Sequence, residues 1–424
     1  MGNGSRDEKI TQLLLVMTIS VSLLLGTLGC AKKITELMEP TAPTTTPKSD
    51  LGYIVVDTRQ DKCYDNSQEI TCPQSGEAFY GQDAQFQGVQ SAYQDNGDGT
   101  ITDLNTGLMW QQNPGDKMTY KKAVANASFF NLAGYDDWRL LTIKELYSLI
   151  LFSGTDPAPE SIEPAVPFID TNYFDFEYGD ISTGERIIDS QFVSSTKYVS
   201  TTMGGDDTVF GVNFADGRIK GYGLTDPRTR GGKEFYAMYV RGNTEYGINA
   251  FIDNIDGTIT DSATGLMWAQ SDSGRGMDWE DALAWVQQKN DGNYLGYNDW
   301  RLPNAKELQS IVDYTRSPAT TNSAAIAPIF GVSTITDEVG GTNYPFCWAG
   351  TTHANAGGGD NAGVYIAFGE SFGYMMNSWV DAHGAGSQRS DPKSGDPDNY
   401  PQGRGPQGDA IRINNYVRLV RGTW

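Results

Sequence analysis

The chain has 424 residues and a formal net charge of -22 at pH 7, from 31 basic and 53 acidic side chains. Such an acidic balance argues against nucleic acid as a partner and against any polyanion held by bulk charge. The 22 Tyr, 17 Phe and 9 Trp are more aromatic residues than disordered chains carry, so most of the chain is expected to fold. The length predicts two or three domains.

The N-terminus is predicted to be an export signal. Residues 1–9 are polar, and a mostly apolar run fills 10–25, followed by a small residue and Cys30. This pattern resembles a bacterial lipoprotein signal, with 1–29 removed and Cys30 lipidated as the membrane anchor. Ala31 after the cysteine favours the outer membrane. An uncleaved anchor and ordinary secretion are the alternatives, and all three would export the protein.

Two segments separate this signal from the main body of the chain. Residues 30–50 combine Pro, Thr and charge, which predicts a flexible tether. Residues 51–92 contain Cys63 and Cys72 on either side of a short loop. In an oxidising compartment these two cysteines are expected to form a disulfide, because no further ligands for zinc lie nearby.

An internal repeat dominates the rest of the sequence. Two blocks recur, the first with thirteen of sixteen positions identical and the second with ten of seventeen. The matching segments are 95–110 with 253–268, and 134–150 with 296–312. Each copy closes on a Val-Arg-Gly segment, so the copies span about 93–242 and 251–422. Both are the size of a domain.

The same order of elements is predicted in each copy. An Asp-Gly turn beside alternating Thr-Ile-Thr predicts an opening hairpin. A first helix is expected after Thr119 or Asp278, and a second after Thr142 or Asn304, where Glu three residues on completes a capping box. Short strands are expected at 192–198, 211–214, 236–241, 346–352, 363–368 and 416–421. The predicted class is α+β, with a short, mostly antiparallel sheet and two helices per domain.

Recurring charged and aromatic residues admit a chemical or a structural interpretation. The set is Trp110, Trp138, Arg139 and Glu145 in the first copy, and Trp268, Trp300, Arg301 and Glu307 in the second. Chemically, they would form carboxylates with an arginine clamp. The structural interpretation is favoured, because the capping box already accounts for each glutamate.

The acidic opening turn suggests calcium, but the spacing argues against an EF-hand. Its first ligand position would be Gln94 in one copy and Ile252 in the other, and isoleucine cannot bind a cation. A tight turn is the favoured interpretation. A calcium site of another kind, built from Asp95, Asp98 and Asp103, stays open, and no other metal or cofactor is expected.

Residues 379–410 form a Gly-, Pro- and Asp-rich segment that has no counterpart of similar length in the first copy. Long irregular loops within compact domains are often functional, and a disordered insertion is the equal alternative. The candidate ligand residues in this segment are Trp379, Asp381, His383, Arg389 and Tyr400.

A catalytic alternative uses Cys347 or His383. Cys347 is left without a partner cysteine, and His353 is six residues away. A buried, unreactive thiol is the favoured interpretation, because this spacing is no evidence of contact.

The repeated blocks, DGTITDLNTGLMW with DWRLLTIKEL and DGTITDSATGLMW with DWRLPNAKEL, resemble the Lcl C-terminal domain family. The segment 56–86 and the closing YVRLVRG add to the resemblance. Leu141 departs from the expected Pro, and Leu419 stands where a Cys is frequent. The resemblance implies an exported protein, and the order of elements is also similar to C-type-lectin-like folds.

The sequence therefore predicts an exported, lipid-anchored envelope protein with two tandem C-type-lectin-like domains and a binding or adhesion role. A glycan or a surface protein is the expected ligand, and the lipid is the only expected membrane contact. Two other functions stay open. One is an enzyme with a cleft in the second domain, and the other is a purely structural envelope protein.

Overall fold

The computed structural model describes residues 51–159, 161–226, 229–357 and 361–422. They belong to one compact unit, Ser49–Trp424. Within these ranges the structure is mostly β-sheet with five α-helices, and no helix is long and apolar enough to cross a membrane. The predicted signal, the tether and Cys30 lie outside the described residues.

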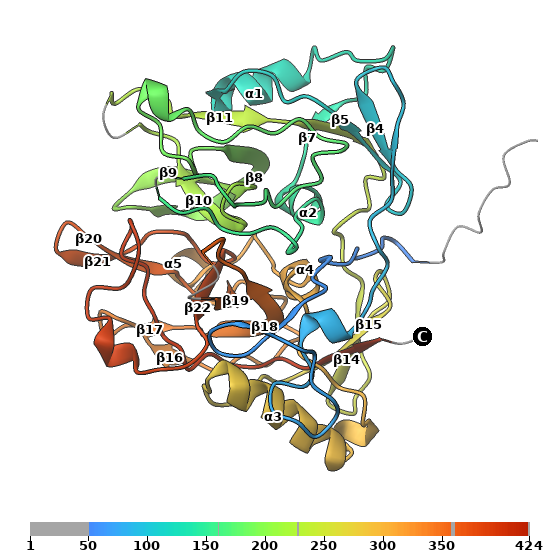
Figure 1. The fold of residues 1–424 in the computed structure, drawn as a ribbon, viewed down its shortest axis with the longest axis vertical. Helices are drawn as coiled ribbons and strands as arrows, with labels where there is room; N and C mark the ends of the chain where they lie inside the picture. Colours follow the sequence, from blue (N-terminus) through green and yellow to red (C-terminus); the bar gives the residue numbers. More distant parts are fainter. Residues whose placement is uncertain (1–50, 160, 227–228, 358–360, 423–424) are drawn as a thin grey trace, which may run out of the picture. The chain divides into compact units, whose positions relative to one another are not determined.

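Each repeat opens with a small antiparallel sheet that its own closing strand completes (Figure 1). The first repeat orders its strands β3 (Tyr93–Asp95), β4 (Thr100–Asp103), β5 (Leu108–Gln111), β12 (Tyr239–Gly242) and β7 (Arg139–Leu140). The second orders them β13 (Phe251–Asp253), β14 (Thr258–Asp261), β15 (Leu266–Ala269) and β23 (Val420–Gly422). The register repeats too, since Val240 pairs with Trp110 and Val420 pairs with Trp268.

The predicted helix caps are present in both repeats. Helix α1 (Tyr120–Ala127) begins after Thr119, and α3 (Trp279–Asp291) begins after Asp278. Helices α2 (Ile143–Ser148) and α4 (Ala305–Ser310) both begin with a complete capping box. The second repeat adds a single turn, α5 (Pro318–Thr321), so the prediction of two helices per domain holds for the first repeat only.

The two repeats share their largest sheet. Its eight strands run in the order β18, β19, β22, β10, β9, β8, β11, β6. Their bounds are Phe346–His353, Ala362–Ala367, Gln388–Pro392, Arg218–Gly223, Asp206–Asn213, Gln191–Thr202, Glu234–Ala237 and Met118–Thr119. Strands β10 and β22 pair antiparallel at Ile219 and Gln388, and we call this junction the seam. Besides its own small sheet, each repeat therefore contributes strands to one continuous sheet across the seam, which the expectation of one short sheet per domain did not include.

Reciprocal lysine contacts join the equivalent helices α2 and α4. Lys144 Nζ donates to the carbonyl oxygen of Ser310 at 2.6 Å, and Lys306 Nζ donates to that of Ser148 at 2.8 Å. These four residues occupy equivalent positions in the two repeats. The interface between the repeats is therefore self-complementary.

The N-terminal segment carries its own hairpin, β1 (Cys63–Tyr64) with β2 (Glu69–Ile70). The disulfide predicted between Cys63 and Cys72 is present. Two further hairpins lie in the second repeat, built from β16 (Ile335–Thr336), β17 (Thr342–Asn343), β20 (Phe372–Met375) and β21 (Ser378–Asp381). Short 3-10 turns complete the described elements at Asp83–Gln85, Ile181–Thr183, Tyr294–Gly296 and Pro397–Asn399.

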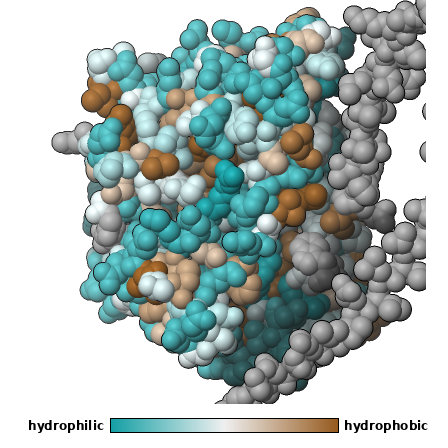
Figure 2. All heavy atoms as spheres, turned by 45° about the vertical axis from the view of Figure 1, so that its right-hand side comes forward, coloured by the Kyte–Doolittle hydropathy of each residue, from teal (hydrophilic) through white to brown (hydrophobic). Residues whose placement is uncertain are grey.

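The apolar core is shared in the same way as the sheet. One cluster of buried side chains combines Trp110 and Phe210 of the first repeat with Trp268 and Ile366 of the second. The face of the molecule in Figure 2 is mostly hydrophilic, with small apolar patches scattered over it. No broad apolar surface is visible on that face, which directs attention to the cavities.

Candidate functional site

The recurring Trp, Arg and Glu residues have structural contacts in both repeats. Arg139 forms a two-point ion pair with Glu145, at 2.7 and 2.5 Å, and Arg301 forms the same pair with Glu307, at 2.6 and 2.5 Å. Each glutamate also caps its helix. The tryptophans Trp110, Trp138, Trp268 and Trp300 are all buried. Their contacts in both repeats are those of a shared scaffold.

The three aspartates of the proposed calcium turn serve the backbone instead. Asp95 accepts from the N–H of Gly97, Asp98 accepts from Thr100, and Asp103 accepts from the N–H of Asn105. Among the residues with described positions, no group of three His, Cys, Asp or Glu side chains is arranged to hold a metal ion.

Cys347 and His353 lie on the same strand, β18, and do not form a pair. Six residues of extended chain separate them by about 20 Å. Cys347 is a buried free thiol whose pKa is raised by burial. His353 stacks on Phe168 and contacts the carbonyl oxygen of Asp216. The interpretation of Cys347 as a nucleophile activated by His353 is therefore wrong.

Residues 379–410 do not form one irregular loop, which corrects the sequence interpretation. Strands β21 and β22 both fall in this range, and β22 sits inside the shared sheet. The N–H of Gly221 on β10 donates to the carbonyl oxygen of His383 at 2.8 Å. A Cβ at Gly221 would come within 2.7 Å of that oxygen, so glycine permits the close approach at the seam.

The five candidate ligand residues of this range do not form one surface. Trp379 packs its ring against Tyr374, Asp381 accepts a hydrogen bond from Tyr198, and Tyr400 follows a 3-10 turn. His383 is fully buried, and only Arg389 lines a cavity.

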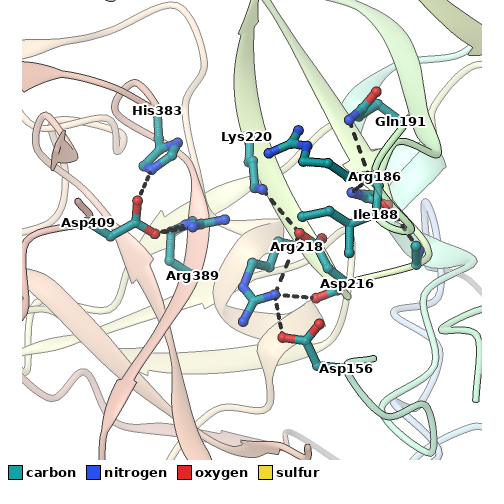
Figure 3. Close-up of polar contacts among 12 residues, drawn as sticks. Asp156, Arg186, Ile188, Gln191, Asp216, Arg218, Lys220, His383, Arg389 and Asp409 are labelled. Carbon is teal, nitrogen blue, oxygen red and sulfur yellow. Dashed lines mark hydrogen bonds and ion pairs between the residues drawn. The ribbon is translucent and has the colours of Figure 1, made fainter. Parts of the chain in front are cut away.

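That cavity lies at the seam and has a volume of about 550 Å³. We call it the seam cavity. Both repeats line it, with Asp156, Arg186, Asp216, Arg218 and Lys220 among the residues of the first and His353, Ala362, Arg389, Arg404 and Asp409 among those of the second. Its charged lining consists of Arg186, Arg218, Lys220, Arg389, Arg404, Asp156, Asp216 and Asp409. Figure 3 shows most of these side chains, with Arg389 and Asp409 on the left of the view and those of the first repeat on the right.

The first repeat contributes a network centred on Asp216. Lys220 Nζ contacts Asp216 Oδ2 at 3.1 Å, and Arg218 lies 3.6 Å from the same oxygen. Arg218 also pairs with Asp156 at 2.8 Å. Burial opposes ionisation of Asp216, but Lys220 and Arg218 hold its pKa below the usual value. Asp216 is therefore an anion held between two cations.

The second repeat contributes a network centred on Asp409 (Figure 3). Its Oδ1 lies 2.7 Å from His383 Nε2, and its Oδ2 accepts from both Nε and Nη2 of Arg389. Burial opposes ionisation of Asp409, but Arg389 and His383 hold its pKa below the usual value.

Both histidines of the chain belong to this region. Burial lowers the pKa of His353 to about 4 and that of His383 to about 4, so both are neutral at pH 7. Burial also lowers the pKa of Lys220 to about 8. The anion Asp216 opposes this shift, and the cation Arg389 adds to it. Lys220 thus titrates closer to neutrality than an ordinary lysine.

Several buried polar atoms at the seam lack a hydrogen-bond partner among the described residues. They are Asp216 Oδ1, Tyr222 OH, His383 Nδ1, Ser387 Oγ, Gln388 Oε1 and Arg389 Nη1. Buried polar groups usually have partners in the protein or in bound molecules. This concentration of unused donors and acceptors marks the seam as a place where a ligand or ordered water completes the hydrogen bonding.

Sequence reasoning named Arg389 and His383 but missed Asp216, Arg218 and Lys220. Their spacing at every second residue is that of one face of a strand, so this alternation of charge was the available signal, although no strand was expected over 216–220. Nothing in the sequence indicated that β10 and β22 would meet.

The fold and the seam cavity define a mostly β protein of two joined repeats with a charged cavity at their junction. Residues 99–241 and 257–382 each match the model of the Lcl C-terminal domain, and together they cover more than half of the chain. The chain therefore belongs to the Lcl C-terminal domain family, with two tandem copies. Comparisons with curated proteins and with solved structures gave no match.

Proposed function

We propose that this protein is exported, anchored to the bacterial outer membrane by a lipid on Cys30, and binds a ligand in the seam cavity. The observation that carries the binding role is the cavity itself. It encloses about 550 Å³, within the range of small-molecule sites, and several buried polar atoms around it lack partners.

Export is supported by two features of the chain. The apolar run stops within five residues of Cys30, as it does in a lipoprotein signal. The Cys63–Cys72 disulfide requires an oxidising compartment, which the cell envelope provides. Labelling cells with radioactive palmitate tests the anchor, because Cys30→Ser would abolish incorporation. Equal labelling of wild type and variant would contradict it.

The finer fold proposal is that each repeat is C-type-lectin-like. The support is the order of elements, an opening hairpin, two helices, long connections and a closing strand that pairs with the last strand of the opening sheet. This resemblance concerns the fold and carries no ligand with it. A glycan or a protein of another cell surface remains the proposed partner class for an envelope protein of this kind.

A ligand screen with a blocked cavity tests the binding role. Purified full-length protein in detergent would be screened on a glycan array and a metabolite library, with calcium and with EDTA. Ala362 lines the cavity and is half-buried, so Ala362→Trp fills the space. Thr201→Trp, at an exposed position that does not line the cavity, is the matched control.

Binding that Ala362→Trp abolishes and Thr201→Trp keeps would support the seam cavity as the site. Binding that both variants keep would place the ligand elsewhere. A screen without any ligand would favour the structural role, and loss of binding in EDTA would return attention to the acidic turns.

A further inference from the structure

The seam cavity differs in charge from the chain that surrounds it. Five basic and three acidic side chains line the cavity, whereas the whole chain has 31 basic and 53 acidic side chains. Each cation taken out of water costs free energy that a partner must offset. Arg186 and Arg404 lie at exposed positions, and the other three cations, Arg218, Lys220 and Arg389, pair with the three lining carboxylates.

Arg389 is the lining residue best suited to bind a further anion. Its side chain is more than nine-tenths buried and lines the cavity. The Nε and Nη2 groups donate to Asp409, but Nη1 donates to none of the described residues. A guanidinium carries five N–H donors in one plane, and an oxyanion is the group that best accepts from them.

On the other side of the seam, Asp216 has a carboxylate oxygen that can accept a further hydrogen bond. Its Oδ2 is shared by Lys220 and Arg218, whereas its Oδ1 is buried without a partner among the described residues. A carboxylate oxygen accepts only from donors, and a ligand hydroxyl is such a donor. Arg389 and Asp216 both line the cavity, so its wall contains one cationic donor and one acceptor without a partner among the described residues.

We infer that the seam cavity is selective for a small organic anion that also carries hydroxyl groups. Its acidic group lies on Arg389, near Lys220, and a hydroxyl donates to Asp216. This inference rests on the proposed function, because it names the class of ligand for the same cavity. A volume of about 550 Å³ fits a body of one or two sugar rings. Carboxylate, phosphate and sulfate share the required acceptor chemistry.

Lys220 provides an independent signature of such a ligand. Burial, with the nearby Arg389, lowers its pKa to about 8, so a fraction of these lysines is neutral at pH 8. A bound anion favours the charged form and raises the pKa. Binding of the acidic ligand at pH 8 is therefore accompanied by proton uptake, which binding of a neutral analogue lacks.

Isothermal titration of the full-length protein with matched probes tests the inference. The probes are glucuronate, glucose 6-phosphate and glucose 6-sulfate, which distinguish the three acidic groups, with glucose as the neutral analogue. Ionic strength is held constant, and titrations at pH 8 in buffers of different ionisation enthalpy report proton uptake. The variants are Arg389→Gln and, as a control, Arg241→Gln, whose arginine pairs with Asp137 outside the cavity.

We expect at least one acidic probe to bind about tenfold more tightly than glucose, with proton uptake. Arg389→Gln should weaken that binding by at least about tenfold, and Arg241→Gln should leave it unchanged. If Arg389→Gln fails to fold, as judged by circular dichroism, Lys220→Met takes its place.

Equal binding of glucose and the acidic probes would overturn the inference and leave the cavity as a binding site. So would an acidic probe whose affinity survives both Arg389→Gln and Ala362→Trp. Failure of every probe at millimolar concentration would overturn the inference as well. The library screen with Ala362→Trp then decides separately whether the proposed function also fails.

Discussion

Replacing Lys306 with Met removes one of the two lysine contacts that join α2 and α4. The Lys306 side chain is buried, and its Nζ donates to two backbone carbonyls, those of Ser148 at 2.8 Å and Asp57 at 2.9 Å. Methionine has a similar volume and no donor, so the packing is largely kept and both carbonyls lose this partner. The expected effect is a loss of stability in the whole described unit.

The size of the loss follows from those two bonds. A buried hydrogen bond contributes about 1 kcal/mol net, and leaving an acceptor without a partner costs about 1–3 kcal/mol. Relief from burying an amine offsets part of this cost. We therefore expect Lys306→Met to lower the free energy of unfolding by about 2–4 kcal/mol.

Urea unfolding followed by tryptophan fluorescence measures this loss. Lys144→Met is the matched variant, because Lys144 donates to the equivalent carbonyl of Ser310. The reasoning requires both variants to destabilise the protein in one cooperative transition. A Lys306→Met protein as stable as the wild type, or more stable, would show that the buried lysine does not hold the repeats together.

The same lysine gives a pH dependence with a defined sign. Burial lowers the pKa of Lys306 to about 7 in the folded protein, whereas an unfolded lysine titrates near about 10.4. Between these values the unfolded chain binds more protons, so the free energy of unfolding rises with pH from about 7 to about 10. Lys306→Met should reduce this rise relative to the wild type. An unchanged pH profile would contradict the lowered pKa.

Three further predictions concern the seam and the cysteines. Gly221→Ala should cost about 1–3 kcal/mol in urea unfolding, because the new Cβ would lie 2.7 Å from the carbonyl oxygen of His383; a neutral effect would mean that the seam yields easily. Cys347, 1% exposed, should react with a maleimide only after denaturation, and rapid labelling of the native protein would contradict its burial. Removing the disulfide with Cys63→Ala and Cys72→Ala should cost about 3 kcal/mol by loop entropy, and an unchanged urea midpoint would refute that estimate.

Local signals predicted much of the scaffold. Thr142 and Asn304 begin their helices as the capping-box spacing indicated, because a cap depends on residues three apart in the chain. The disulfide followed from the short loop between Cys63 and Cys72 in the same way. The repeat itself was visible as two pairs of segments with many identical residues.

The seam could not be predicted, because it joins residues far apart in the chain. Gln388 pairs with Ile219 across more than 160 positions, and the strand around it reads Gln-Arg-Ser-Asp-Pro, without the apolar alternation that marks a strand. Its polar residues face the seam cavity and partners such as Asp409, so it was interpreted as loop. The sequence therefore indicated only the residues that the second repeat contributes to the site, such as Arg389, and not those of the first repeat.

The reciprocal contacts of Lys144 and Lys306 make the junction the kind of interface through which two identical subunits associate. Tandem duplication of a gene for one such subunit would place both partners on a single polypeptide. Once fused, the two halves no longer need to be identical. One half can carry Lys220 while the other carries Arg389, so an asymmetric ligand can be recognised on an ancestrally symmetric frame.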